Sequence, residues 1–210
     1  VGGDLRPERL LLAYSMGIFP WQGEPLHWHS PDPRMVLLAD ELRVSRSLSR
    51  RLRRGDLRLT LDTAFEEVMR ECSAPRDGQA GTWIVPEMVA AYTRLHELGF
   101  AHSVESWKDG RLAGGLYGIL LGRAFFGESM FSRETDASKV ALVKLVERVR
   151  ELGVRVIDCQ QATRHLASLG AREIPRREFA HLLAESIQYP PTGSRWPASE
   201  EAWRSSTTSP

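Results

Sequence analysis

The sequence of 210 residues has few cysteines and no long apolar run. Its two cysteines, Cys72 and Cys159, have no paired spacing, which excludes a disulfide framework and a zinc knuckle and favours a reducing compartment. No apolar stretch approaches the roughly 20 residues of a membrane-spanning helix, and the first residues lack the features of a signal peptide. We therefore expect a cytoplasmic protein without a membrane segment.

The chain also lacks a strong net charge, because 28 basic residues nearly balance 27 acidic residues, which leaves +1. No overall field attracts long nucleic acid, so any contact with RNA has to be local. Among the six histidines, only His27 and His29 stand close together, and two histidines alone do not make a metal site. We predict no metal ion and no other cofactor.

A hydrophobic content of 42% is enough for the core of one ordinary domain with a small appendage. Residues 18–34 contain four prolines and two tryptophans, a composition too broken for a regular element, so we predict a domain boundary there. We expect a small N-terminal domain at 1–34 and a main domain at 35–189. Residues 190–210 are rich in Pro, Ser and Thr, which predicts a mobile tail.

Hydrophobic periodicity and turn residues predict most of the secondary structure. Helices are expected at 7–17, 45–54, 62–72, 86–99 and 136–153, with Asp136 as the cap of the last, and two short helices follow it. Strands are expected at 35–38, 57–60, 101–107, 111–120, 123–131 and 154–158. The hairpin meander, the long helix and the strand that rejoins the sheet predict an α+β fold. This fold resembles the acetyltransferase superfamily, with a mostly antiparallel sheet flanked by helices.

Acetyltransferases of that superfamily hold the CoA pyrophosphate on a glycine-rich loop at a helix N-terminus. Here the turn before the long helix, residues 132–136 (SRETD), has no glycine and two acids. A CoA-dependent N-acetyltransferase is therefore an alternative that this turn disfavours.

Three polar side chains stand in predicted strands. Alternate residues of a strand share a face, so Asp158 and Gln160 point to one side and Cys159 to the other. The pair is a plausible catalytic unit, or Asp158 simply binds a neighbouring backbone; Cys159 is assigned to the core. Glu128 lies in an apolar strand, where burying a carboxylate requires compensation. Either an ion pair with a basic residue such as Lys139 supplies it, or the carboxylate is functional.

The expected basic helix carries Arg46, Arg50 and Arg53 at i, i+4 and i+7, on one face. Such a face is either solvated surface or a local phosphate-binding patch, and five arginines without an acid between 46 and 54 favour phosphate. Trp21 and Trp83 offer surfaces on which an unpaired base can stack, or they belong to the core. A non-catalytic module that binds an RNA end is thus a second alternative.

Six strings of the sequence are characteristic, and they occur in a fixed order between about residues 2 and 185. They are residues 14–21 (YSMGIFPW), 28–34 (WHSPDPR), 81–84 (GTWI), 127–132 (GESMFS), 157–160 (IDCQ) and 165–171 (HLASLGA). In these strings the chain resembles the leucyl/phenylalanyl-tRNA–protein transferase family. The resemblance implies a small N-terminal domain on an acetyltransferase-like domain. It also implies transfer of Leu, Phe or sometimes Met from aminoacyl-tRNA to proteins that begin with Arg or Lys, which marks them for degradation.

The resemblance further implies the roles of individual residues. Catalytic positions fall on Asp158 and Gln160, with Glu128 close by, and adenosine contacts fall on Trp21 and Trp83. The amino-acid side-chain pocket falls on Leu116, Phe125, Met130, Leu142 and Leu145. The acceptor-stem contacts fall on Arg46, Arg50 and Arg53.

A mechanism follows as a hypothesis. Since an ordinary Asp, with a pKa near about 3.9, is a poor base, we interpret Asp158 as orienting Gln160. The amide oxygen of Gln160 then accepts a hydrogen bond from the attacking amine. Glu128 either binds the incoming ammonium or positions the terminal ribose.

Overall fold

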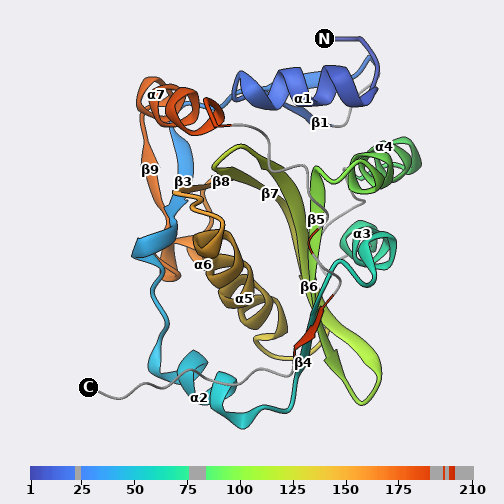
Figure 1. The fold of residues 1–210 in the computed structure, drawn as a ribbon, viewed down its shortest axis with the longest axis vertical. Coiled ribbons are helices and arrows are strands. Elements are labelled where there is room, and N and C mark those ends of the chain that lie inside the picture. The colour runs from blue at the N-terminus through green and yellow to red at the C-terminus, as the bar shows by residue number, and fades with distance from the viewer. Residues whose placement is uncertain (22–24, 76–83, 190–195, 197–198, 202–210) are drawn as a thin grey trace.

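The computed structural model describes residues 1–21, 25–75, 84–189, 196 and 199–201. Within these residues an eight-stranded, mostly antiparallel sheet carries helices on both faces, and a two-stranded sheet lies near the N-terminus (Figure 1). The predicted α+β class, with a mostly antiparallel sheet flanked by helices, is confirmed. None of the helices in the described ranges has the length and apolarity needed to cross a bilayer.

The elements follow the predicted order closely. The helices are α1 (Pro7–Ser15), α2 (Arg46–Arg54), α3 (Phe65–Ser73), α4 (Pro86–Glu97), α5 (Ala137–Glu151), α6 (Arg164–Ser168) and α7 (Arg176–Ile187), with a 3-10 turn η1 (Ala39–Glu41). The strands are β1 (Phe19–Trp21), β2 (His27–His29), β3 (Arg34–Leu38), β4 (Arg58–Leu61), β5 (Ala101–Lys108), β6 (Arg111–Leu121), β7 (Ala124–Ser132), β8 (Val156–Gln160), β9 (Arg172–Ile174) and β10 (Ser199–Glu201). The large sheet has the order β10-β4-β5-β6-β7-β8-β3-β9, and of these neighbours β7 and β8 run parallel.

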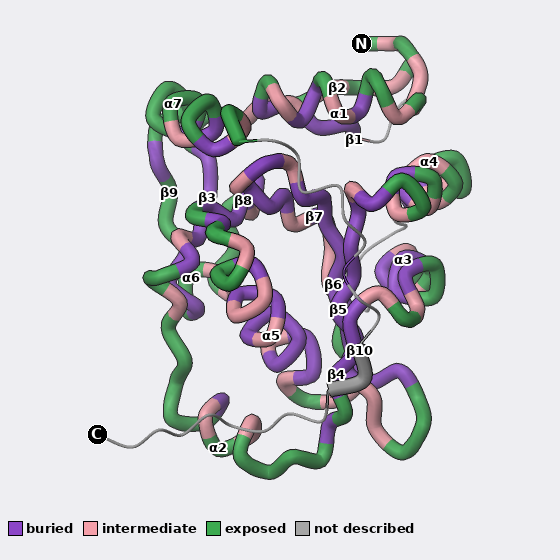
Figure 2. The backbone as a smooth tube through the Cα atoms, viewed as in Figure 1, coloured by how far each residue is buried: buried purple, intermediate pink, exposed green. Residues whose placement is uncertain are grey.

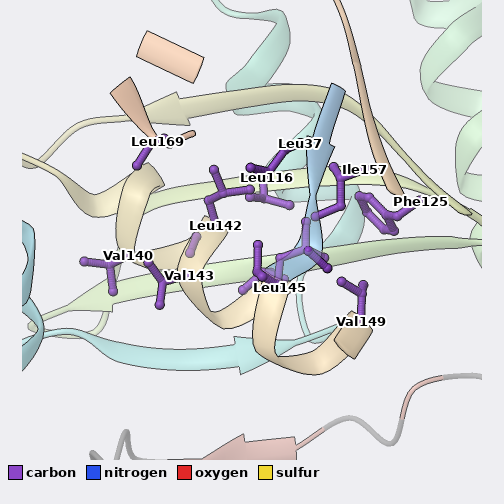
Figure 3. Close-up of a cluster of buried hydrophobic side chains, with 14 of the residues drawn as sticks. Leu37, Leu116, Phe125, Val140, Leu142, Val143, Leu145, Val149, Ile157 and Leu169 are labelled. Carbon is purple, nitrogen blue, oxygen red and sulfur yellow. The ribbon is translucent and has the colours of Figure 1, made fainter. Parts of the chain in front are cut away.

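Two buried clusters cover the two faces of the large sheet. Helix α5 packs on one face, where its apolar stripe meets the inward side chains of β6, β7 and β8 (Figure 3). Helices α1, α3, α4 and α7 supply the cluster on the opposite face. The central strands are buried along most of their length, as the purple trace in Figure 2 shows. Burial on both faces explains why β6 is a nearly continuous apolar run without strict alternation.

The N-terminal segment differs from its prediction. Instead of remaining irregular, β1 and β2 pair antiparallel, with Pro20 opposite Trp28. Each strand of a two-stranded sheet has a free edge, where a proline without an N–H group is tolerated. Phe19 is buried in the same cluster as Phe126 of β7, so the segment packs on the large sheet.

The start of α5 and the C-terminal residues also differ from their predictions. Asp136 occupies the N-cap position, but its side chain accepts no capping hydrogen bond and pairs with Lys139 at 2.6 Å. In the segment expected to be a mobile tail, Trp196 is buried against the α5 cluster and β10 pairs with β4. Burial of a large indole ring is a favourable contribution that composition alone does not predict.

Candidate active site

The candidate site lies where β7 and β8 separate. Their backbone pairing ends at Phe126 and Asp158. Two residues further along each strand, the side chains bridge the gap, because Nε2 of Gln160 donates a hydrogen bond to Oε1 of Glu128 at 2.8 Å. The structure thus brings the three predicted catalytic residues together, and all of them are buried: Asp158 is 1% exposed, Gln160 5% and Glu128 8%.

Asp158 is held by an arginine that lies 124 residues earlier in the chain. Nε and Nη2 of Arg34 donate to Oδ1 and Oδ2 of Asp158 at 2.8 and 2.6 Å. This bidentate geometry is the strongest form of a charge-assisted hydrogen bond, and it compensates for the burial of both charges. The carboxylate of Asp158 therefore has a fixed plane.

Gln160 has an uncommon backbone conformation, with φ of 62° in the left-handed region. Its main-chain N–H donates to Oδ1 of Asp158 at 2.9 Å. Left-handed backbone is unfavourable for a residue with a Cβ and persists where surrounding contacts hold it. Asp158 therefore fixes the backbone of Gln160, whereas Glu128 holds its carboxamide. Asp158 was predicted to orient Gln160, and the hydrogen bond between them is made by the main chain of Gln160 and not by its carboxamide.

The expected facing of the strand residues is confirmed. Cys159 packs against the α5 cluster, whereas Gln160 reaches Glu128 on the other side of the sheet. Burial raises the pKa of the Cys159 thiol, and the nearby charge of Asp158 raises it further. A thiol that stays protonated suits a core residue and not a nucleophile.

Glu128 is the titratable group of the site. Burial raises its pKa to about 7, against the lowering effect of a hydrogen bond with Tyr14. The charge of Asp158 raises the pKa as well, whereas a hydrogen bond with Tyr92 and the charge of Arg34 lower it. The carboxyl group therefore changes its charge near neutral pH. The alternative was an ion pair with a nearby Arg or with Lys139. Lys139 binds Asp136, whereas the charge of Arg34 does act on Glu128.

Two tyrosine hydroxyls complete the surroundings of Glu128. The Tyr92 hydroxyl donates to Oε2 of Glu128 at 3.3 Å, and the hydroxyls of Tyr14 and Tyr92 lie 2.5 Å apart. Burial raises the pKa of both phenols, so they remain hydrogen-bond donors at neutral pH. Helices α1 and α4 thus contribute to a site whose other groups come from strands.

The apolar residues assigned to the amino-acid pocket lie in one cluster. Leu116 and Phe125 project from β6 and β7, and Leu142 and Leu145 face them from α5 (Figure 3). Met130 is partly buried and packs against the same cluster. The structure therefore brings all five together on the α5 side of the sheet.

Of the five residues predicted to contact tRNA, the structure describes four. Trp21 is half-buried in β1, with its ring 6.1 Å from that of Phe19, and Trp83 lies outside the described residues. Arg46, Arg50 and Arg53 are exposed on α2, which lies beside the start of α5 (Figure 1). Within the part of the chain that the structure describes, none of these three arginines forms a salt bridge.

Comparison with known proteins identifies the family. A family model described as leucyl/phenylalanyl-tRNA protein transferase matches residues 36–184, and the model of its N-terminal domain matches residues 3–32. The chain belongs to this family. Proteins of this name include one from Nitrosospira multiformis, 59% identical over 93% of this chain and 85% of the relative. Another, from Stutzerimonas stutzeri, is 62% identical over 90% of this chain and 84% of the relative.

The similarity to solved structures is much weaker. A GCN5-related N-acetyltransferase from Kribbella flavida aligns over 80% of this chain and 60% of that protein, with 10% identity and a TM-score of 0.43. This similarity is too distant for an inference about activity.

Three residues of the candidate site were not predicted from the sequence. Arg34 opens the apolar strand RMVLL, and a charged residue at the edge of such a run is a signal that it needs a buried partner. Tyr14 and Tyr92 stand in amphipathic helices, where their spacing fits ordinary core positions. Their proximity to Glu128 follows from the packing of α1 and α4 alone.

In the described ranges, no group of three His, Cys, Asp or Glu residues is arranged to hold a metal ion.

Proposed function

We propose that this transferase moves Leu, Phe or Met from aminoacyl-tRNA to the α-amine of proteins that begin with Arg or Lys, and so marks them for degradation. The names of its relatives support the transfer from tRNA to protein. The observation that carries the proposal for this chain is the buried Glu128–Gln160 pair at the point where β7 and β8 separate. The two free cysteines support a cytoplasmic location.

The proposed chemistry needs positioning more than activation. An aminoacyl ester is already activated, so the enzyme has to hold its carbonyl beside a neutral amine and stabilise the tetrahedral intermediate. The amine nitrogen forms the new amide bond, the ester C–O bond breaks, and the tRNA hydroxyl leaves with a proton. No covalent intermediate with the enzyme is required.

Gln160 and Glu128 suit the amine side of this reaction. Nε2 of Gln160 donates to Glu128. The other carboxamide atom of Gln160, its Oε1, is therefore oriented to accept an N–H from the attacking amine. A free α-amine has a pKa near about 7.7 to 8.0, so a modest proton acceptor is sufficient. With a pKa of about 7, Glu128 is matched to the proton of the α-ammonium. We assign Glu128 to the incoming amine on this ground.

The direct test is transfer of labelled Leu from Leu-tRNA to a peptide that begins with Arg. We expect a labelled peptide bond, and no product from the same peptide with an acetylated N-terminus. Lack of transfer to the free peptide would refute the proposal. Acetylation of the peptide from acetyl-CoA would favour the acetyltransferase alternative instead.

The amino-acid preference tests the apolar cluster. A narrow apolar pocket favours Leu, Phe and Met over Val, because a β-branch widens the side chain at its stem. We expect kcat/KM for Val-tRNA to be lower than that for Leu-tRNA by a factor of about 10 to 100. Charged tRNAs assayed in parallel with one acceptor peptide measure the ratio, and equal use of Val would contradict the assignment of Leu116, Phe125, Met130, Leu142 and Leu145.

The arginine face of α2 is proposed to contact the tRNA acceptor stem. Replacing Arg46, Arg50 and Arg53 by Ala is expected to weaken binding of Leu-tRNA about 10- to 100-fold and to lower the salt slope by about 3, because three phosphate contacts are lost. A leucyl-adenosine mimic is too short to reach α2 and should bind unchanged.

A matched control for this test replaces three exposed arginines that are paired with acids. Arg9, Arg70 and Arg94 contact Asp4, Glu66 and Glu97, respectively. Their replacement by Ala should leave tRNA affinity within about twofold, as expected for surface salt bridges away from the RNA. Equal weakening by the two triple variants would show that total charge, and not the α2 face, determines binding.

A further inference from the structure

Arg34 is a fully buried cation whose position is set by few contacts. Its guanidinium lies between the ring of Phe19, 4.9 Å away, and the ring of Phe179, 4.6 Å away. Its Nη1 has no hydrogen-bond partner among the described residues. The two hydrogen bonds to Asp158 are therefore the polar contacts of a guanidinium otherwise held by aromatic faces.

The contacts of Arg34 extend to Gln160 through Asp158. The oxygen Oδ1 of Asp158 accepts from both Arg34 Nε and the main-chain N–H of Gln160. Rotation of the carboxylate would break both hydrogen bonds, and Gln160 would lose the contact that holds its left-handed backbone. A lysine in place of Arg34 retains the charge, but its single ammonium cannot fix the plane of the carboxylate.

Arg34 also connects the site to two distant elements. Phe19 comes from β1 in the N-terminal segment and Phe179 comes from α7, and both rings hold the same guanidinium. Because Nε and Nη2 of Arg34 donate to both carboxylate oxygens of Asp158, a shift of the Arg34 side chain acts directly on Asp158. A misplacement of about 1 Å can lower catalysis about 100-fold.

We propose that Arg34 is the positioning residue of the transferase site: it acts through Asp158 to hold the main chain of Gln160, and this places the Gln160 carboxamide toward the attacking amine. The expected effect on kcat rests on the proposed function. The effect of Arg34 on the geometry of Asp158 and Gln160 does not depend on that function.

The charge of Arg34 provides a readout that does not depend on turnover. Burial and the charge of Asp158 raise the pKa of Glu128, and the charge of Arg34 lowers it. The phenols of Tyr14 and Tyr92 face Glu128 from α1 and α4. Burial and the charge of Glu128 also raise the pKa of the Tyr117 phenol on β6. Since the charge of Arg34 lowers the pKa of Glu128, its removal withdraws this effect while the hydrogen bonds with Tyr14 and Tyr92 remain, and the pKa of Glu128 rises further.

The kinetic test compares Arg34→Lys and Arg34→Met with the unaltered transferase. We expect kcat for Leu transfer to fall about tenfold in Arg34→Lys and about 30-fold in Arg34→Met, because positioning is lost while tRNA binding is retained. KM for Leu-tRNA should change less than about threefold. Arg172→Met is the matched control, since Arg172 lies exposed on the neighbouring strand β9 and pairs with Glu41. Its kcat should stay within about twofold.

A double variant tests whether Arg34 acts through Asp158. In the background of Asp158→Asn, the change Arg34→Met should cause no further loss of kcat, because the two residues act as one unit. This double variant also avoids a lone buried charge, so it keeps the test possible if Arg34→Met does not fold. A full additional loss in the double variant, or a folded Arg34→Met with unchanged kcat, would overturn the proposal.

The carboxyl resonance of Glu128 in 13C-labelled protein separates this inference from the proposed function. We expect its pKa to rise above about 7 in Arg34→Met and to stay unchanged in Arg172→Met. An unchanged value in Arg34→Met would overturn the inference even if transfer is observed. If the unaltered protein transfers no Leu, the proposed function fails, and the titration still decides whether Arg34 controls the site.

Discussion

Replacement of Gln160 by Ala is expected to lower kcat for Leu transfer about a thousandfold, the effect of removing a positioned polar group from a buried reaction site. Gln160 is fixed at both ends: its carboxamide by the hydrogen bond from Nε2 to Glu128, and its main chain by the hydrogen bond from its N–H to Asp158. No reorganisation is then needed when the amine attacks. The measurement is single-turnover transfer from Leu-tRNA to an Arg-initiated peptide.

The neighbouring residue supplies the control for Gln160→Ala. Cys159 faces the α5 cluster, so Cys159→Ala should retain kcat within about twofold while losing some stability as a small core truncation. Asp158→Asn keeps an oxygen near the Gln160 N–H but loses the charge that binds Arg34, and about a hundredfold loss is expected. All three variants should bind Leu-tRNA as the parent does. Full activity of Gln160→Ala would refute the catalytic assignment.

The polar residues of the site differ in how far the sequence predicts them. The two-residue period of a strand is a local rule, and it correctly predicts that Asp158 and Gln160 share one side and Cys159 the other. The left-handed backbone of Gln160 has no local signal, because it depends on a carboxylate held by Arg34, which is distant in the sequence. Contacts over 124 residues are beyond any periodicity argument.

The meander and α5 are predictable from their patterns because their apolar residues are numerous and regular. The pair β1 and β2 is not, because the four prolines of residues 18–34 outweigh two very short strands in any local count. Burial of Trp196 escapes prediction for a similar reason, since one large side chain in a polar segment hardly changes its composition. The residues of the site that come from helices, Tyr14 and Tyr92, show that helix packing is the step that local rules do not reach.

Glu128→Gln is expected to remove a pH-dependent loss of stability. The pKa of Glu128 is raised from 4.5 to about 7 in the folded protein, chiefly by burial. A raised carboxyl pKa means that folding favours the protonated form. Its contribution to stability is therefore complete below pH 4.5 and is lost as the pH rises through about 7. Between pH 5 and pH 8 this group should lower the free energy of unfolding by about 2 to 3 kcal/mol.

The amide introduced by Glu128→Gln stays neutral at every pH, and its oxygen can still accept a hydrogen bond from Gln160. The free energy of unfolding of the variant should therefore not fall in this way between pH 5 and pH 8. Urea unfolding of both proteins at these two pH values measures the difference. Other titrating groups, such as the buried Glu105, whose pKa is also raised, are common to both proteins and cancel in the comparison. Glu173→Gln, at an exposed position of β9, is the control and should keep the parent's pH dependence. The same fall in Glu128→Gln as in the parent would mean that Glu128 is not the group that titrates near neutral pH, and its assignment to the incoming amine would lose its basis.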